Sequence, residues 1–318
     1  MNFKLLRSLS APGIQKSLGT SSCEFKSWIA QGKYKVTSVS QQGDIELYVT
    51  DQDALLESLG YDFSRFACAS FESMEGIVGS NAFPKATAWA GIAAYYSAFF
   101  GAHAILRYFG SSCSQIEQAQ ACLLTDYASI YNINKRIQVG FYAAEYFPST
   151  RMLKLKKLND THKDTWQKLN EVLKDLSSKI LQVPGISQET QEISNLLINM
   201  SDAISNSGRF ASGNWLSSFR NNLNYKHEYE AWYPYKKSSV KFKQIKKYVG
   251  DWSSDAFNPE LGLLEKDERL RFFGTCSAIV YLAHGIAKDL AIMADRRSVH
   301  RNKTERFSKL TEAGRAKS

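Results

Sequence analysis

PKATAWAGIAAYYSAFFGAHAILRYFG, residues 84–110, is the stretch of this 318-residue sequence that decides the fold. Proline suits the first turn of a helix, and Gly110 suits its end. Between them, apolar side chains recur at alternating steps of three and four, which predicts a helix with a buried face. Residues 86–106 contain no Asp, Glu, Lys or Arg. Their content of Ala, Gly, Ser and Tyr, with His103, nevertheless favours a central core helix over a membrane span.

Three further segments show helical spacing of their apolar residues: 151–182, 187–205 and 266–294. His162 falls on the apolar seam of the first segment, so we expect a histidine that is satisfied within or beside the core. Near the start of the chain, two short β-like runs flank QQGD within residues 33–50, which predicts a hairpin. The pattern as a whole indicates a mainly α protein with a small N-terminal α/β extension.

The chain is basic, with 40 Lys and Arg against 31 Asp and Glu. Six lysines and no acid lie in residues 234–250, and a second basic segment forms the tail, residues 296–318. A positive surface attracts phosphate, but a solvated face is an equally good interpretation of either segment alone. Five cysteines without a paired spacing indicate free thiols and a reducing, cytoplasmic location. We expect no metal, no cofactor and no membrane partner.

The sequence RNNLNYKH, residues 220–227, separates Arg220 from His227 by seven positions. We expect one helix over residues 214–228. Seven helical steps turn by about 700°, so the two side chains would share one face within about 20° but lie about 10 Å apart along the axis. The spacing alone is a weak signal, and three features support it: polar Asn221 after the arginine, the predicted helix, and the aromatics and lysines downstream.

Two motifs together resemble the HEPN superfamily. RNNLNYKH is similar to its R-x4-6-H signature, and AYYSAFFGAHAIL, residues 94–106, is similar to the aromatic first helix of many HEPN proteins. The motifs also occur in the family's order. The resemblance implies an up-and-down HEPN-like helical bundle over residues 61–295. Residues 1–60, as an N-terminal extension, and helical insertions near 130–185 depart from a minimal bundle of this family, and residues 296–318 form a basic C-terminal tail.

The resemblance also implies a function, namely metal-independent endoribonuclease activity in a toxin or antiviral defence effector. Arg220 and His227 would be catalytic, and Asn221 would help to orient the site. A ribose 2′-hydroxyl would attack the adjacent phosphate and leave a 2′,3′-cyclic phosphate. Histidine is suited to the proton transfer and a guanidinium to the developing charge. A homodimer would bring two copies of the pair around one groove. An antitoxin or regulatory protein is a further expected partner.

The segment after His227 alternates aromatic and basic side chains, a combination typical of single-stranded RNA binding. We therefore expect an RNA-binding rim made of Tyr229, Trp232, Tyr235, Lys236, Lys237, Lys241 and Lys243. In the alternative interpretation, the aromatics pack against the bundle and the lysines are solvated. The alternative function is a catalytically inactive HEPN-like module that binds RNA, a nucleotide or a protein.

Overall fold

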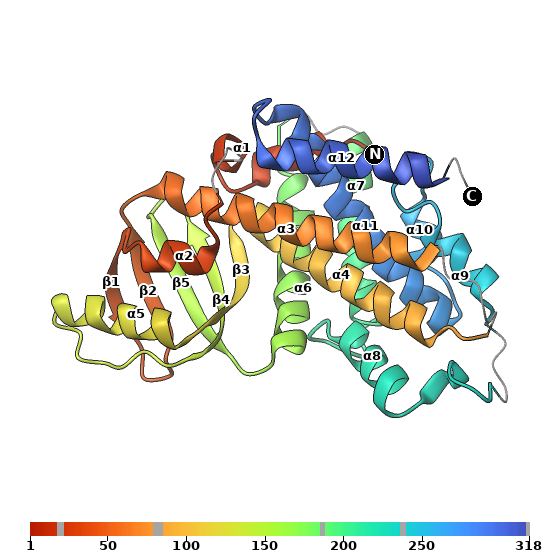
Figure 1. Ribbon diagram of the computed structural model, residues 1–318, viewed down its shortest axis with the longest axis horizontal. Helices are drawn as coiled ribbons and strands as arrows, with labels where there is room; N and C mark the ends of the chain where they lie inside the picture. Colours follow the sequence, from red (N-terminus) through yellow and green to blue (C-terminus); the bar gives the residue numbers. More distant parts are fainter. Residues whose placement is uncertain (18–21, 79–84, 185–187, 236–239, 316–318) are drawn as a thin grey trace.

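In the computed structural model, a helical bundle and a five-stranded antiparallel sheet share one hydrophobic core (Figure 1). The structure describes residues 1–17, 22–78, 85–184, 188–235 and 240–315, with backbone alone at residues 16, 17 and 78 and from residue 310. The protein is mostly helical, as predicted, and the sheet lies at one end of the molecule.

The elements follow one another along the chain with these bounds: η1 Phe3–Leu9, α1 Ile14–Ser17, α2 Phe25–Ala30, β1 Tyr34–Val39, β2 Ile45–Val49, α3 Gln52–Val78, α4 Ala88–Tyr108, β3 Ser111–Ile116, α5 Gln118–Ile130, β4 Gly140–Phe147, β5 Met152–Leu158, α6 Thr161–Ile180, α7 Gln188–Ile204, α8 Trp215–Tyr225, η2 Glu228–Glu230, α9 Phe242–Val249, α10 Pro259–Leu263, α11 Glu268–Met293 and α12 Val299–Arg315.

The N-terminal hairpin is confirmed, and it belongs to a larger sheet than its local sequence indicates. β1 pairs with β2, and β2 pairs with β5, giving the strand order β1-β2-β5-β4-β3. The helix expected over residues 151–182 is therefore wrong at its start, because Met152–Leu158 forms β5 and α6 begins at Thr161. Strands from residues 1–60 and from the insertion near 130–185 thus form one sheet.

The two faces of the sheet differ because side chains alternate along each strand. Leu47 pairs with Leu153 on the buried face, while Glu46 pairs with Lys154 on the open face. Helices α2 and α5 cover the buried face at the β1 edge, where the Tyr34 ring contacts Trp28 and Tyr127. The sheet therefore contributes one apolar face to the main core. Its other face is charged at Glu46 and Lys154, while at the β3–β4 end Cys113 and Ala143 form a small second cluster with Leu106 of α4.

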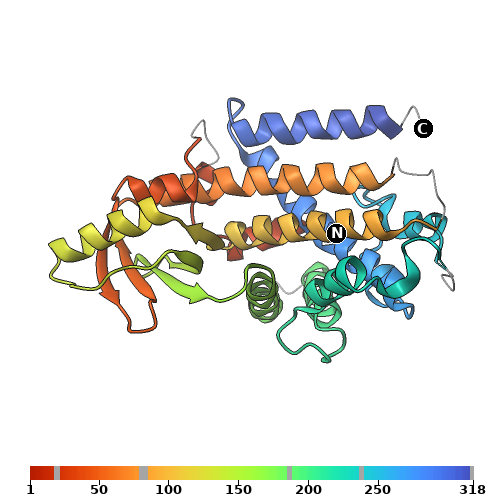
Figure 2. The ribbon, with the colours of Figure 1, turned by 60° about the horizontal axis from the view of Figure 1, so that its bottom comes forward.

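The central position predicted for the helix of residues 84–110 is confirmed in α4, which the structure describes from Ala88. It runs beside α3 in both views of the ribbon (Figures 1 and 2). Two serine hydroxyls join this pair, since Ser70 donates to the Ser97 carbonyl at 2.7 Å and Ser97 donates to the Ser70 carbonyl at 2.5 Å. On its other side α4 packs against α11.

Helix α11 confirms the predicted helix at 266–294 to within two residues at each end. It is long and apolar enough by composition to cross a membrane, but 78% of its most apolar window is buried inside the fold. This burial is that of a core helix. The helix predicted at 187–205 is likewise present as α7.

The basic tail differs from the solvated segment that the sequence indicated. Residues 299–315 form α12, which lies along α3 (Figure 2). His300 and Thr304 are buried. The His300 Nδ1 lies 2.7 Å from the Ser64 Oγ of α3, and its Nε2 lies 3.1 Å from the Ala287 carbonyl of α11. At least the first part of the tail is therefore a docked helix.

Candidate functional site

Helix α8 carries Arg220 but not His227, which corrects the predicted single helix over residues 214–228. It ends at Tyr225, and His227 has the left-handed backbone conformation, with φ of 51°. The Trp232 indole donates to the Leu223 carbonyl at 2.9 Å, so a side chain satisfies a carbonyl near the helix end. Arg220 and His227 therefore do not share the helical face that their spacing predicted.

The Arg220 side chain points into the junction of α4, α6 and α8, and the residue is only 8% exposed. Its guanidinium carbon lies 5.1 Å from the centre of the Tyr95 ring and 5.9 Å from that of Tyr225. Rings at these distances attract the cation. The Arg220 Nε is buried and has no hydrogen-bond partner among the described residues. An unmet buried donor of this kind needs a physical explanation.

Tyr95 lies at the centre of a polar cluster beneath Arg220. Its hydroxyl accepts from the Trp166 indole at 3.0 Å and lies 2.9 Å from His162 Nδ1. Burial raises the pKa of Tyr95 to about 12, so the hydroxyl stays protonated at neutral pH. Burial, followed by the nearby charge of Arg220, lowers the pKa of His162. The expectation of a satisfied histidine at position 162 is confirmed.

His227 lies in an aromatic cluster on the surface of the protein. Its ring centre is 5.9 Å from that of Trp232, and Trp232 in turn meets Trp89 edge to face at 5.5 Å. Trp89 is 69% exposed and Tyr225 is 71% exposed. The sequence analysis did not single out Trp89, which belongs to the first turn of α4. The structure, unlike the sequence, shows that exposed aromatic rings lie near His227, and such rings indicate a binding surface.

Some of the predicted RNA-binding residues pack against the helices, and others are exposed on the surface. Tyr229 is partly buried and stacks on Phe219 at 4.2 Å, and Trp232 is partly buried at the end of α8. Tyr235 is partly exposed beside Tyr233, which is 84% exposed.

The remaining predicted site residues are polar or basic. Lys241 and Lys243 line a surface hollow of about 690 Å³ at α9. Asn221 is exposed. Lys236 and Lys237 lie outside the described residues.

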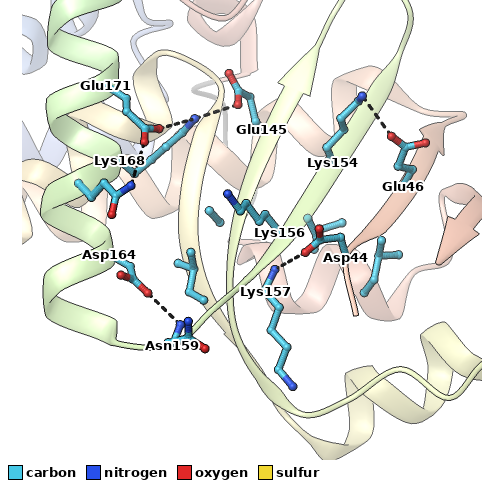
Figure 3. A pocket seen from close by; sticks show the side chains of 15 residues that line it. Asp44, Glu46, Glu145, Lys154, Lys156, Lys157, Asn159, Asp164, Lys168 and Glu171 are labelled. Atoms are coloured by element: carbon cyan, nitrogen blue, oxygen red, sulfur yellow. Dashed lines mark hydrogen bonds and ion pairs between the residues drawn. The ribbon is translucent and has the colours of Figure 1, made fainter. Parts of the chain in front are cut away.

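A separate cavity of about 450 Å³ lies between the open face of the sheet and α6 (Figure 3). Its charges are largely paired: Lys168 lies 2.8 Å from Glu145, and Lys154 lies 3.1 Å from Glu46. The Asp164 carboxylate accepts from two backbone N–H groups at the start of α6. Neither Arg220 nor His227 lines this cavity, so it is distinct from the predicted site.

Over the described parts of the chain, no three His, Cys, Asp or Glu side chains come together in a group able to hold a metal ion. Comparison with protein-family models, with curated proteins and with solved structures found no match to this chain. The HEPN resemblance therefore rests on the two sequence motifs.

Proposed function

We propose that this protein is a metal-independent endoribonuclease of the HEPN type that cleaves single-stranded RNA. The observation that carries the proposal is the buried guanidinium of Arg220, which keeps an unpaired Nε donor near the exposed ring of Tyr225. Phosphate oxygens are the acceptors that a guanidinium fork fits best. Trp89, Tyr225 and Tyr233 offer exposed rings on which bases can stack.

The reaction needs no group beyond side chains and RNA. The ribose 2′-oxygen attacks the adjacent phosphorus and gives its proton to a base, while the bond from phosphorus to the 5′-oxygen breaks. The departing 5′-oxygen takes up a proton, which leaves a 2′,3′-cyclic phosphate and a 5′-hydroxyl. His227 serves one of these proton transfers, and Arg220 stabilises the extra negative charge on the phosphate. Exposed Asn221 orients the RNA beside Arg220.

A homodimer is part of this proposal. In one subunit Arg220 packs against Tyr95 while His227 lies beyond the helix end beside Trp232. A two-fold axis near α8 would bring His227 of each subunit towards Arg220 of the other. Such an enzyme would act as a toxin or antiviral defence effector, and a regulatory protein or antitoxin would restrain it.

One observation favours a second function, that of a catalytically inactive module that binds RNA. Helix α8 ends before His227, and Arg220 is buried, as expected for a structural arginine that fixes α8 to α4. In this case the exposed aromatics and lysines would still bind single-stranded RNA, and neither Arg220 nor His227 would handle a proton or a phosphate.

Incubation of RNA with the purified protein in a metal chelator separates the two functions. An endoribonuclease yields 2′,3′-cyclic phosphate ends, and His227→Ala abolishes them while RNA binding persists. Arg220→Lys keeps the charge without the bidentate fork and should reduce cleavage at least about a hundredfold. Binding without any cleavage would support the inactive module, and cleavage that survives both substitutions would exclude the proposed site.

A further inference from the structure

We propose that Arg220 and His162 form, within a single subunit, a binding site for one phosphate group of the RNA backbone, with Tyr95 as the residue that positions both. The inference rests on the proposed function for its substrate class, and its geometry is independent of His227. It adds His162 to the site as a phosphate-binding residue. The phosphate site is then formed by α4, α6 and α8 of one subunit, which carry Tyr95, His162 and Arg220.

Tyr95 connects the two residues because it touches both. His162 Nδ1 lies 2.9 Å from the Tyr95 hydroxyl, and the Arg220 guanidinium lies over the Tyr95 ring at 5.1 Å. The hydroxyl also interacts with the Arg220 side chain. Tyr95 is fully buried in α4, where Phe99 stacks on its ring and Trp166 meets it edge to face. The two polar groups are therefore held by a rigid support.

Hydrogen-bond chemistry directs the second ring nitrogen of His162 away from Tyr95. The Trp166 indole can only donate, so the Tyr95 oxygen accepts that bond and its own proton is available for His162 Nδ1. A neutral imidazole that accepts at Nδ1 carries its proton on Nε2. Nε2 of His162 has no hydrogen-bond partner among the described residues, and the residue is partly buried. The site therefore offers an N–H donor beside a guanidinium.

The donors remain unmet in the absence of an anion. Arg220 Nε is buried without a partner, and a buried unpaired N–H is unfavourable by about 1 to 3 kcal/mol. A phosphate oxygen accepts such a bond, and the guanidinium charge strengthens it. In this proposal the phosphate reaches Arg220 past the ring of Tyr225, which is 71% exposed at the end of α8 and lies 5.9 Å from the guanidinium carbon.

Nuclear magnetic resonance on the full chain with ¹⁵N-labelled histidine and arginine tests the site directly. The signals of His162 and of the Arg220 Nε–H are followed during titration with inorganic phosphate and with a 2′-O-methyl single-stranded oligonucleotide, which cannot be cleaved. We expect both signals to shift saturably with either ligand. His162→Gln and Arg220→Gln should each raise the dissociation constant about tenfold or more, while Ile292→Ala, at an exposed position of α11 outside the site, leaves phosphate binding unchanged.

The outcomes separate this inference from the proposed function. Saturable shifts of His162 and Arg220 in a protein that does not cleave RNA would support the phosphate site and remove the nuclease. RNA cleavage by a protein whose His162 and Arg220 signals ignore both ligands would support the nuclease and overturn the phosphate site. Since the wild-type signals carry the result, the test holds even if Arg220→Gln fails to fold.

Discussion

Trp89 is the largest exposed aromatic side chain beside His227, and its exposure predicts a specific effect on binding. We expect Trp89→Ala to weaken binding of a 2′-O-methyl single-stranded oligonucleotide about tenfold to a hundredfold, because stacking of one base contributes about 1 to 3 kcal/mol. Protein stability should change little, since the ring is 69% exposed. Fluorescence anisotropy measures the affinity. Ile292→Ala, at a position 70% exposed on α11, is the control and should bind normally.

His300 predicts a pH dependence of stability. Burial lowers its pKa to about 4, with Lys303 nearby, whereas the unfolded chain has the ordinary value near 6.5. As pH falls from 6.5 towards 4, the unfolded chain binds a proton that the folded protein does not, so stability is lost. Between pH 7 and pH 5 this residue should remove about 2 kcal/mol.

Urea unfolding of the wild type and His300→Gln at both pH values isolates this contribution. His103, whose pKa burial also lowers, changes both proteins alike and cancels in the comparison. The stability difference between wild type and variant should shrink as pH falls. A difference that stays constant from pH 7 to pH 5 would show that His300 titrates normally in the folded protein.

At the scale of elements, α10 and α11 approach each other through two glycines. A Cβ on Gly274 would lie 2.3 Å from the Gly262 Cα, which is backbone and cannot rotate away. We expect Gly274→Ala to lower the free energy of unfolding by about 2 to 3 kcal/mol through steric overlap. Gly76→Ala on α3 is the matched control: nothing lies within 4 Å of its added Cβ, so it should stabilise by about 1 kcal/mol. Thermal unfolding of both variants compares them.

Local sequence patterns predicted two kinds of element: strands that pair with a neighbouring strand in the sequence, and helices whose apolar spacing continues over many residues. The β1–β2 hairpin, α4, α7 and α11 are of these kinds. Strand β5 was missed because its leucines also fit the helical seam that continues into α6. Its alternation of Leu153 and Leu155 with lysines has period two, as in a strand. The pairing of β5 with β4 is a local hairpin in which Met152 pairs with Phe147, whereas the pairing with β2 joins Leu155 to the distant Ile45.

The candidate site was predictable only in part, because several of its contacts join residues that are far apart in the sequence. Arg220 and the aromatic helix were found from sequence, but the end of α8 depends on Trp232, which returns to bond the Leu223 carbonyl. The contact of Tyr95 with His162 joins residues 67 positions apart. Trp89 became notable only through its exposure, which depends on the packing of α4 and not on its sequence neighbours.

At the scale of the whole molecule, the sheet and the bundle are continuous. Helix α3 contains residue 61, the expected start of the bundle, and runs from the sheet into the bundle (Figure 1). A fragment of residues 61–295 would lose β1, β2 and buried Trp28, and would leave β5 unpaired along one edge. We expect this fragment to show no cooperative thermal transition. A transition like that of the full chain would show that the bundle folds alone.

An oligonucleotide with a single ribose in a DNA strand tests whether the protein cleaves RNA without metal. In chelator, the wild type should cut only on the 3′ side of that ribose and leave a 2′,3′-cyclic phosphate, because the attacking 2′-hydroxyl exists nowhere else. His227→Ala and Arg220→Lys should leave the strand intact or cut it at least about a hundredfold more slowly. Cutting at deoxyribose positions, or equal cutting by both variants, would contradict the account.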